Sequence, residues 1–210
     1  MEMKQDKTRN IFILLTRTST PFSRAIRLVT QCEYTHASIG IAENSNEFFS
    51  FGRKEAYTLP TTAGFINENL LEGILYRNQD SPCMLFRLKV TEEVYLAIQD
   101  KLKDFERQYE KYSYSFLGTV LCYFSVPHTI KNKYFCSQFV AEILSSTNAL
   151  DLGKSPSIYH PSDFVKEPKL ECCYQGTLKE LAEFLKNNNE VSTYYSITQQ
   201  DNDFISHGKA

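Results

Sequence analysis

Hydrophobic residues follow a strand-like pattern at several places along the chain. Five segments are short, apolar or alternating, and bounded by turn residues, as β-strands are: 11–15, 35–41, 47–51, 83–90 and 172–174. A short polar loop, Glu43 to Asn46, separates the second segment from the third and predicts a hairpin. The Gly- and Thr-containing residues 59–73 are expected to form a looser stretch against the sheet edge.

Apolar residues recur at helical spacing elsewhere, in segments 22–29, 91–112, 136–144 and 177–185. In the longest of these, apolar side chains follow one another every three or four positions from Val94 to Tyr112, and Thr91 is placed to cap its amino end. Cys136 falls at the start of the third helix. Strands mixed with helices in this order predict an α+β fold, with an antiparallel sheet flanked by helices.

Length and composition indicate one domain covering residues 1–210. The chain has 210 residues, 42% of them hydrophobic, which suffices for one substantial core. No repeat or Pro/Gly/Ser linker divides it, and the Asn-, Gln- and Ser-rich tail from Asn187 is expected to be loosely held.

Charge and hydropathy exclude some classes of partner and indicate the cellular compartment. The net charge of -2, without a basic block, argues against a nucleic-acid partner, which requires a basic face. No stretch approaches the roughly 20 apolar residues of a membrane helix, so no membrane partner is expected. The polar residues 1–10 and the five-residue apolar run after them do not form a secretory signal, and a cytoplasmic location is expected.

Six cysteines are present, and their spacing predicts neither disulfides nor a metal site. A reducing compartment disfavours structural disulfides, and no CxxC or Cys/His ligand pattern occurs. We therefore expect no metal and no cofactor, and most cysteines are expected to be small buried hydrophobes.

Cys136 is the cysteine best placed for nucleophilic chemistry. A thiol attacks as the thiolate, and the amino end of a helix favours that anion through its unpaired N–H groups and dipole. A catalytic thiol also needs a base, usually a histidine within hydrogen-bond reach. His36 begins a strand whose alternate residues, Ser38 and Gly40, are small and leave room beside a helix end. We predict that these two residues form a catalytic pair.

The sequences around both residues resemble a known family. Residues 34–41, Tyr-Thr-His-Ala-Ser-Ile-Gly-Ile, are similar to the histidine strand of permuted NlpC-type papain-like cysteine peptidases, the YiiX-like group. Residues 134–142, Tyr-Phe-Cys-Ser-Gln-Phe-Val-Ala-Glu, resemble that group's cysteine helix. Segments 111–118 and 160–164 resemble the stretches that flank this helix in the family, so that the resemblance covers about residues 11–175.

The order of the two residues also fits this resemblance. Papain has its cysteine before its histidine, whereas here His36 precedes Cys136 by a hundred residues, as in the permuted group. The resemblance implies a circularly permuted papain-like (NlpC-type) fold and the hydrolysis of an amide bond.

A third polar residue orients the imidazole in such enzymes, from the strand that follows the histidine. The usual spacing falls near Ser50, where many relatives carry a carboxylate. Ser50 is therefore the expected third catalytic residue. Glu47 is the neighbouring alternative and faces the other way on an alternating strand.

Other residues of interest have weaker signals. Tyr34 and Tyr114 are candidate walls of a substrate pocket, and the backbone N–H of Cys136 is a natural oxyanion donor. His128 and His160 are alternative bases in turn-like contexts. Asp163 is expected to cap a helix or turn rather than to act in catalysis.

The expected function is that of a cysteine amidase or peptidase acting on a small peptide or other amide, such as one derived from cell walls. One alternative is a thioester-forming acyltransferase of the lecithin:retinol acyltransferase type, which shares the permuted arrangement. Another is a binding module without turnover, an interpretation favoured by the lack of a carboxylate near Ser50. The sequence indicates neither the substrate nor the oligomeric state.

Overall fold

A computed structural model describes residues 7–17, 32–41, 46–53 and 63–187, and the structural statements below concern these residues. The helix expected at 22–29 and the tail beyond residue 187 lie outside them.

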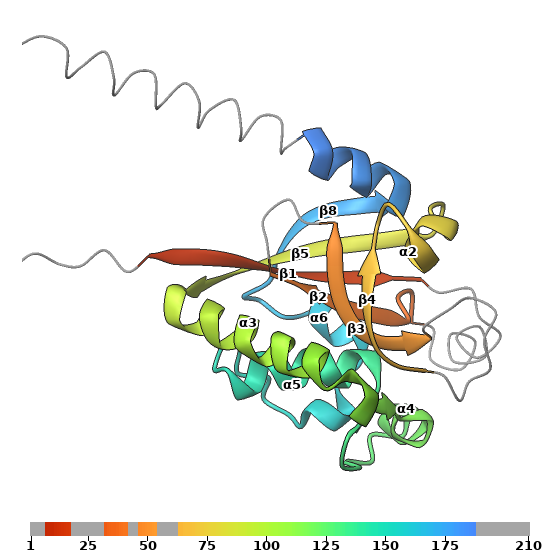
Figure 1. Cartoon of the computed structure of the whole chain (residues 1–210), viewed down its shortest axis with the longest axis vertical. Helices are drawn as coiled ribbons and strands as arrows, with labels where there is room; N and C mark the ends of the chain where they lie inside the picture. The colour runs from red at the N-terminus through yellow and green to blue at the C-terminus, as the bar shows by residue number, and fades with distance from the viewer. Residues whose placement is uncertain (1–6, 18–31, 42–45, 54–62, 188–210) are drawn as a thin grey trace, which may run out of the picture.

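Six strands form one antiparallel sheet in the order β4-β3-β2-β1-β5-β8 (Figure 1). Their bounds are β1 (Thr8–Thr16), β2 (His36–Gly40), β3 (Glu47–Arg53), β4 (Ala63–Asn69), β5 (Pro82–Thr91) and β8 (Glu171–Thr177). β1 lies at the centre, where Leu14 pairs with Ser38 on one side and with Leu85 on the other. Its residues 11–16 are almost all buried, as the apolar run of the sequence predicts.

Helices cover the sheet and complete the domain. They are α2 (Gly73–Arg77), α3 (Glu92–Arg107), α4 (Phe116–Tyr123), α5 (Cys136–Ser146), α6 (Pro161–Val165) and a further helix at 178–187. In Figure 1, α3, α4 and α5 are grouped on one side of the sheet, whereas the helix at 178–187 lies at its β8 end. Two short strands, β6 (Ser113–Tyr114) and β7 (Lys133–Tyr134), pair in parallel ahead of α4 and α5. The predicted α+β class is confirmed.

The hydrophobic interior has two parts. The larger cluster joins β1, β2 and β3 to α3 and α5, with Phe51, Phe139 and Ile98 fully buried in it. The smaller cluster packs Leu14, Cys83 and Leu85 against the helix at 178–187, whose Leu181 is fully buried. The larger cluster holds α5 against β2 and β3, and so fixes the amino end of α5 relative to the sheet.

Two expectations from the pattern are wrong in detail. Residues 59–73 do not form only a loose stretch, since Ala63–Asn69 is the edge strand β4, paired with β3 over its whole length. The predicted helix 91–112 ends at Arg107, and a 3-10 turn, Tyr109–Lys111, follows it. Its start is as expected, because the Thr91 hydroxyl accepts a hydrogen bond from the N–H of Val94 at 3.3 Å.

Candidate active site

Cys136 is the first residue of α5, as the sequence predicts. Phe135 precedes it in an extended conformation and has no side-chain group to cap the helix, and the first turn of α5 contains no acidic residue. The free N–H groups of that turn are therefore available to an anion. The Cys136 side chain is nearly enclosed, with 5% of its surface exposed, and its Sγ lies 4.0 Å from the carbonyl oxygen of Thr35.

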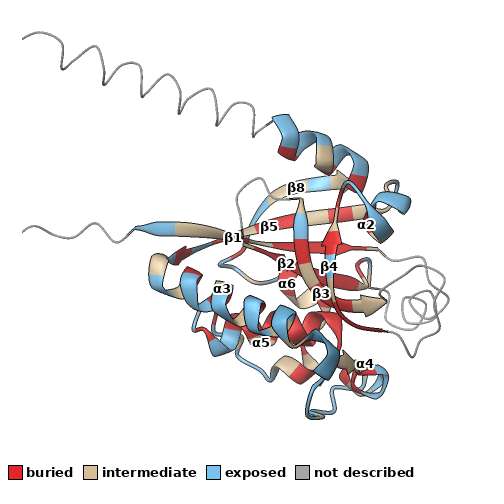
Figure 2. Ribbon diagram, in the orientation of Figure 1, coloured by how far each residue is buried: buried red, intermediate tan, exposed pale blue. Residues whose placement is uncertain are grey.

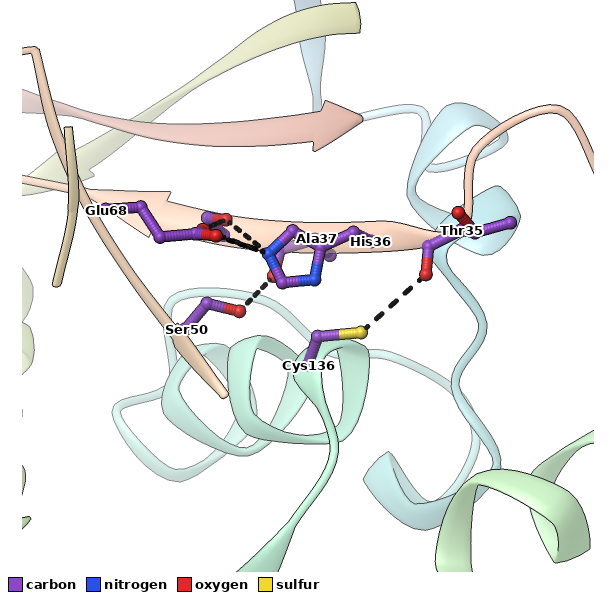
Figure 3. Close-up of polar contacts among 7 residues, drawn as sticks. Thr35, His36, Ala37, Ser50, Glu68 and Cys136 are labelled. Atoms are coloured by element: carbon purple, nitrogen blue, oxygen red, sulfur yellow. Dashed lines mark hydrogen bonds and ion pairs between the residues drawn. The ribbon is translucent and has the colours of Figure 1, made fainter. Parts of the chain in front are cut away.

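His36 begins β2 and faces the same site (Figure 3). It pairs with Thr16 of β1, and β2 is buried along its whole length, which fixes the start of the strand. On the neighbouring strand, Gly52 lies beside the ring, since a Cβ there would lie 3.7 Å from Cε1 of His36, an ordinary contact distance, and 2.8 Å from Ile66. The pairing of β2 with β1 thus fixes the backbone from which the imidazole projects.

Glu68 of β4 supplies the carboxylate that orients this imidazole. Its two oxygens lie 2.9 and 3.0 Å from Nε2 of His36, and Ser38 donates a hydrogen bond of 2.5 Å to the same carboxylate. Glu68 is 8% exposed, so the His36–Glu68 pair is shielded from water. With Nε2 taken by Glu68, the second ring nitrogen, Nδ1, lies on the side of Cys136 in Figure 3.

The titration behaviour of His36 reflects two opposing influences. Burial alone lowers its pKa, but the Glu68 carboxylate and the interaction with Cys136 together outweigh burial and hold the pKa well above the usual 6.5. The surroundings of His36 therefore favour its protonated form.

The pKa of the Cys136 thiol shifts in the opposite direction. Burial raises the pKa of Cys136, yet the hydrogen bond and charge of His36, followed by the backbone N–H groups of Ala37 and Ser137, lower it below the usual 9.0. Both shifts favour an ion pair of a thiolate with an imidazolium at the amino end of a helix.

Ser50 does not have the role expected for it. Its hydroxyl is fully buried and donates a hydrogen bond of 2.7 Å to the carbonyl oxygen of Ala37, so it tethers β3 to β2. Glu47 is exposed at the start of β3. The residue in contact with the imidazole is instead Glu68, which the sequence interpretation missed because 63–69 lacks strand alternation and so gave no sign of a strand beside β3.

The two candidate tyrosines lie in different surroundings. Tyr34 is buried in the larger core cluster. Tyr114 is half-buried, its hydroxyl accepts a hydrogen bond of 3.3 Å from Thr119, and its pKa is raised by burial and next by the charge of Cys136. The pKa of Tyr123 is raised in the same order of causes. Tyr114 and Tyr123 are therefore close enough to Cys136 to respond to its charge, and Tyr123 was not predicted.

His160, one of the two alternative bases, has a structural role. The N–H of the His160 ring donates a 3.0 Å hydrogen bond to the carbonyl oxygen of Cys122, which ties α6 to the end of α4. The Asp163 carboxylate accepts a 2.6 Å hydrogen bond from the backbone N–H of His160 and binds Lys154 at 2.7 Å. The expectation that Asp163 caps a helix is confirmed.

All six cysteines are free thiols. Within the described ranges, no three His, Cys, Asp or Glu side chains are grouped so that they could hold a metal ion. No helix in the same ranges combines the length and apolar character needed to cross a bilayer.

In comparisons with known proteins, no family model, curated protein or solved structure matches this chain. The family resemblance of the two motifs therefore stays a prediction, and the function has to be argued from the site itself.

Proposed function

We propose that the protein is a cysteine amidase or peptidase in which Cys136 is the nucleophile, His36 the general acid and base, and Glu68 the residue that orients His36. The observation that carries the proposal is the placement of Cys136 at the amino end of α5 beside the His36 ring, with the buried carboxylate of Glu68 on the far nitrogen of the imidazole. The same arrangement of nucleophile, base and orienting group recurs on unrelated folds that perform acyl transfer.

The proposed reaction has two steps. The Cys136 sulfur attacks the carbonyl carbon, and the resulting oxyanion accepts hydrogen bonds from N–H groups at the start of α5. The His36 imidazolium then gives its proton to the amine nitrogen as the C–N bond breaks, which leaves a thioester on Cys136. A water molecule next attacks the thioester while neutral His36 takes its proton. This releases a carboxylic acid and restores the thiolate–imidazolium pair.

The substrate we propose is a small peptide or peptide-like amide. The fold that we propose for this chemistry is the permuted papain-like one, supported by the order of His36 and Cys136 and by the packing of α5 on β2 and β3. The carboxylate of Glu68 weakens the case for a binding module without turnover, since that reading depended on the lack of such a group.

Trapping the thioester tests this function. The chain would be mixed with short peptide amides that release a fluorescent amine, quenched in acid, and the cysteine-containing peptides weighed. We expect amine release together with an acyl group on Cys136, and neither in Cys136→Ala or His36→Ala. Cys122→Ala is the matched control, because Cys122 is a buried thiol on the neighbouring helix whose pKa is raised by burial to about 12. Amine release that persists in Cys136→Ala would contradict the proposal.

The same assay separates hydrolysis from acyl transfer. We expect the free acid as the main product even when an acceptor amine is added in excess. A new amide as the main product would favour the acyltransferase alternative.

A further inference from the structure

Exposed apolar side chains gather on and directly after α4. Among the described residues, eleven large hydrophobic side chains are exposed, and five of them fall within residues 116–126: Phe116, Leu117, Val120, Phe124 and Val126. The most exposed of the eleven is Phe124, at 72%. Figure 2 shows exposed residues along α4 and on the loop beyond it. We call these five side chains the α4 apolar surface.

Four of these side chains, on α4 and its C-cap residue, share one face of the helix. At about 100° per residue, positions 116, 117, 120 and 124 fall within an arc of about 100°. The buried side of α4 instead carries small or polar residues, Gly118, Thr119 and Cys122. The distribution is thus the reverse of an ordinary surface helix, whose large apolar residues face the core. Contiguous apolar surface of this kind on a folded domain marks an interaction site.

The charged side chains in the chain segment around α4 all have one sign. The chain has a net charge of -2, yet no Asp or Glu occurs between Glu110 and Glu142, where Lys111, Lys131 and Lys133 are present and exposed. Lys133 pairs with Ser113 in the β6–β7 ribbon, which leads directly into α4. The apolar face is therefore accompanied by cations along the same segment of chain.

Contacts on the buried side and at the start of α4 place this helix next to the start of α5. A Cβ on Gly118 would meet Phe135, the residue before Cys136, at 3.4 Å, and the N–H of Ser115 donates to the carbonyl oxygen of Tyr134 at 2.9 Å. Asp163 of the adjacent α6 is already bound by Lys154. The exposed apolar face lies on the other side of α4 from these contacts.

We propose that the α4 apolar surface, together with Lys111, Lys131 and Lys133, docks onto the surface of a membrane rich in anionic phospholipid. Exposed aromatic and aliphatic side chains enter the boundary between headgroups and acyl chains, while lysines bind the lipid charges. Charge complementarity selects this partner over a neutral one. The expectation of no membrane partner relied on the lack of a spanning segment, whereas this contact requires none. The proposal stands apart from the amide chemistry, since it uses no residue of the catalytic pair.

A tryptophan reporter tests the docking directly, because the chain contains no tryptophan. Phe124→Trp would be titrated with phosphatidylcholine vesicles made with and without phosphatidylserine. We expect its emission to shift to shorter wavelength only with phosphatidylserine, and the shift to weaken as salt is added. Leu96→Trp is the matched control, an apolar position that is 47% exposed on α3, and its emission is expected to stay unchanged.

Vesicle sedimentation of the full chain supplies the second measurement. Leu117→Ser with Phe124→Ser is expected to weaken binding at least roughly tenfold. Lys131→Gln with Lys133→Gln should weaken it by about fivefold for each lysine. Leu96→Ser with Lys103→Gln serves as the control pair on α3. The alkylation rate of Cys136 in each variant verifies that the fold and the catalytic pair are intact.

The vesicle experiments have outcomes that either support or overturn the proposal. Binding that needs phosphatidylserine and is lost in both α4 variants supports the proposal. No binding, or binding that the α4 variants do not change, overturns it. Concentration-dependent dimers in sedimentation velocity, abolished by Leu117→Ser with Phe124→Ser and without vesicle binding, would overturn it in favour of a second copy of this chain on the surface.

Discussion

At the scale of single residues, the site depends on how the two nitrogens of one imidazole are used. Glu68 lies at 2.9 and 3.0 Å from Nε2 of His36, which leaves Nδ1 for the thiol. A buried carboxylate in this position fixes both the ring orientation and the charge of the imidazolium. Its charge also reaches Cys136 indirectly, because the imidazolium lowers the pKa of the thiol.

Replacement of this carboxylate gives the first prediction. Glu68→Gln removes the charge that raises the pKa of His36, and we expect that pKa to fall and the pKa of Cys136 to rise. Amide hydrolysis should decrease about 100-fold or more. NMR titration of the His36 ring measures the first effect. Glu47→Gln is the matched control at an exposed position, and an equal change in the two variants would show that Glu68 has no special role.

Ser50 gives a contrasting prediction. Ser50→Ala removes the hydrogen bond to the Ala37 carbonyl, and we expect the free energy of unfolding to fall by about 1 kcal/mol. The pKa of Cys136 should not move. Urea denaturation and thiol alkylation measure the two quantities. A shifted alkylation profile in a variant of unchanged stability would restore Ser50 as a catalytic residue.

At the scale of elements, β4 is the strand that completes the site. It carries Glu68 and pairs with β3 over its whole length, and its Gly64 packs so closely against the turn before β6 that a Cβ would lie 2.9 Å from the carbonyl oxygen of Tyr112. The contact is with backbone, which cannot rotate away. Gly64 therefore permits the approach that places β4 in the domain.

Enlarging this residue is predicted to destabilise the protein. Gly64→Ala should lower the free energy of unfolding by about 1 to 3 kcal/mol, because the backbone of β4 or of the turn has to move. Asn67→Ala, at an exposed position of the same strand, is the control. Equal stability of the two variants in urea denaturation would mean that the close approach of Gly64 is not needed.

The elements also show what the sequence could predict. Cys136 and His36 were found because local patterns mark them: a helix start for the cysteine and an apolar strand for the histidine. Residues 63–69, Ala-Gly-Phe-Ile-Asn-Glu-Asn, have neither clear alternation nor strong strand formers, and they become a strand through pairing with β3. Glu68 therefore could not be assigned from local signals, because its role depends on a tertiary contact.

At the scale of the whole molecule, the two hydrophobic clusters have different roles. The larger one seats α5 on the sheet and so sets the distance between Cys136 and His36. The smaller one joins Leu14 and Leu85 to the helix at 178–187. Long-range packing thus gathers residues from positions 36, 68 and 136, whereas the second cluster contributes stability without touching that arrangement.

A core substitution tests this division. Leu181→Ala is expected to lower the free energy of unfolding by about 2 to 5 kcal/mol, since it opens a cavity in the smaller cluster. The alkylation rate of Cys136 in the folded protein should stay unchanged. Glu183→Ala, exposed on the same helix, is the control. A slower alkylation rate in folded Leu181→Ala would contradict the separation.

The central claim is that Cys136 and His36 form a thiolate–imidazolium pair. The most direct measurement is the rate of Cys136 alkylation by iodoacetamide as a function of pH, followed by mass spectrometry of the Cys136 peptide. An ordinary thiol is only about 1% ionised two pH units below its pKa, whereas the lowered pKa of Cys136 predicts alkylation at pH 6 that is faster than that of a model thiol. In His36→Ala the profile should move to higher pH, because burial then acts on the thiol without the imidazolium. Alkylation at pH 6 no faster than that of a model thiol, or an unchanged profile in His36→Ala, would contradict the account.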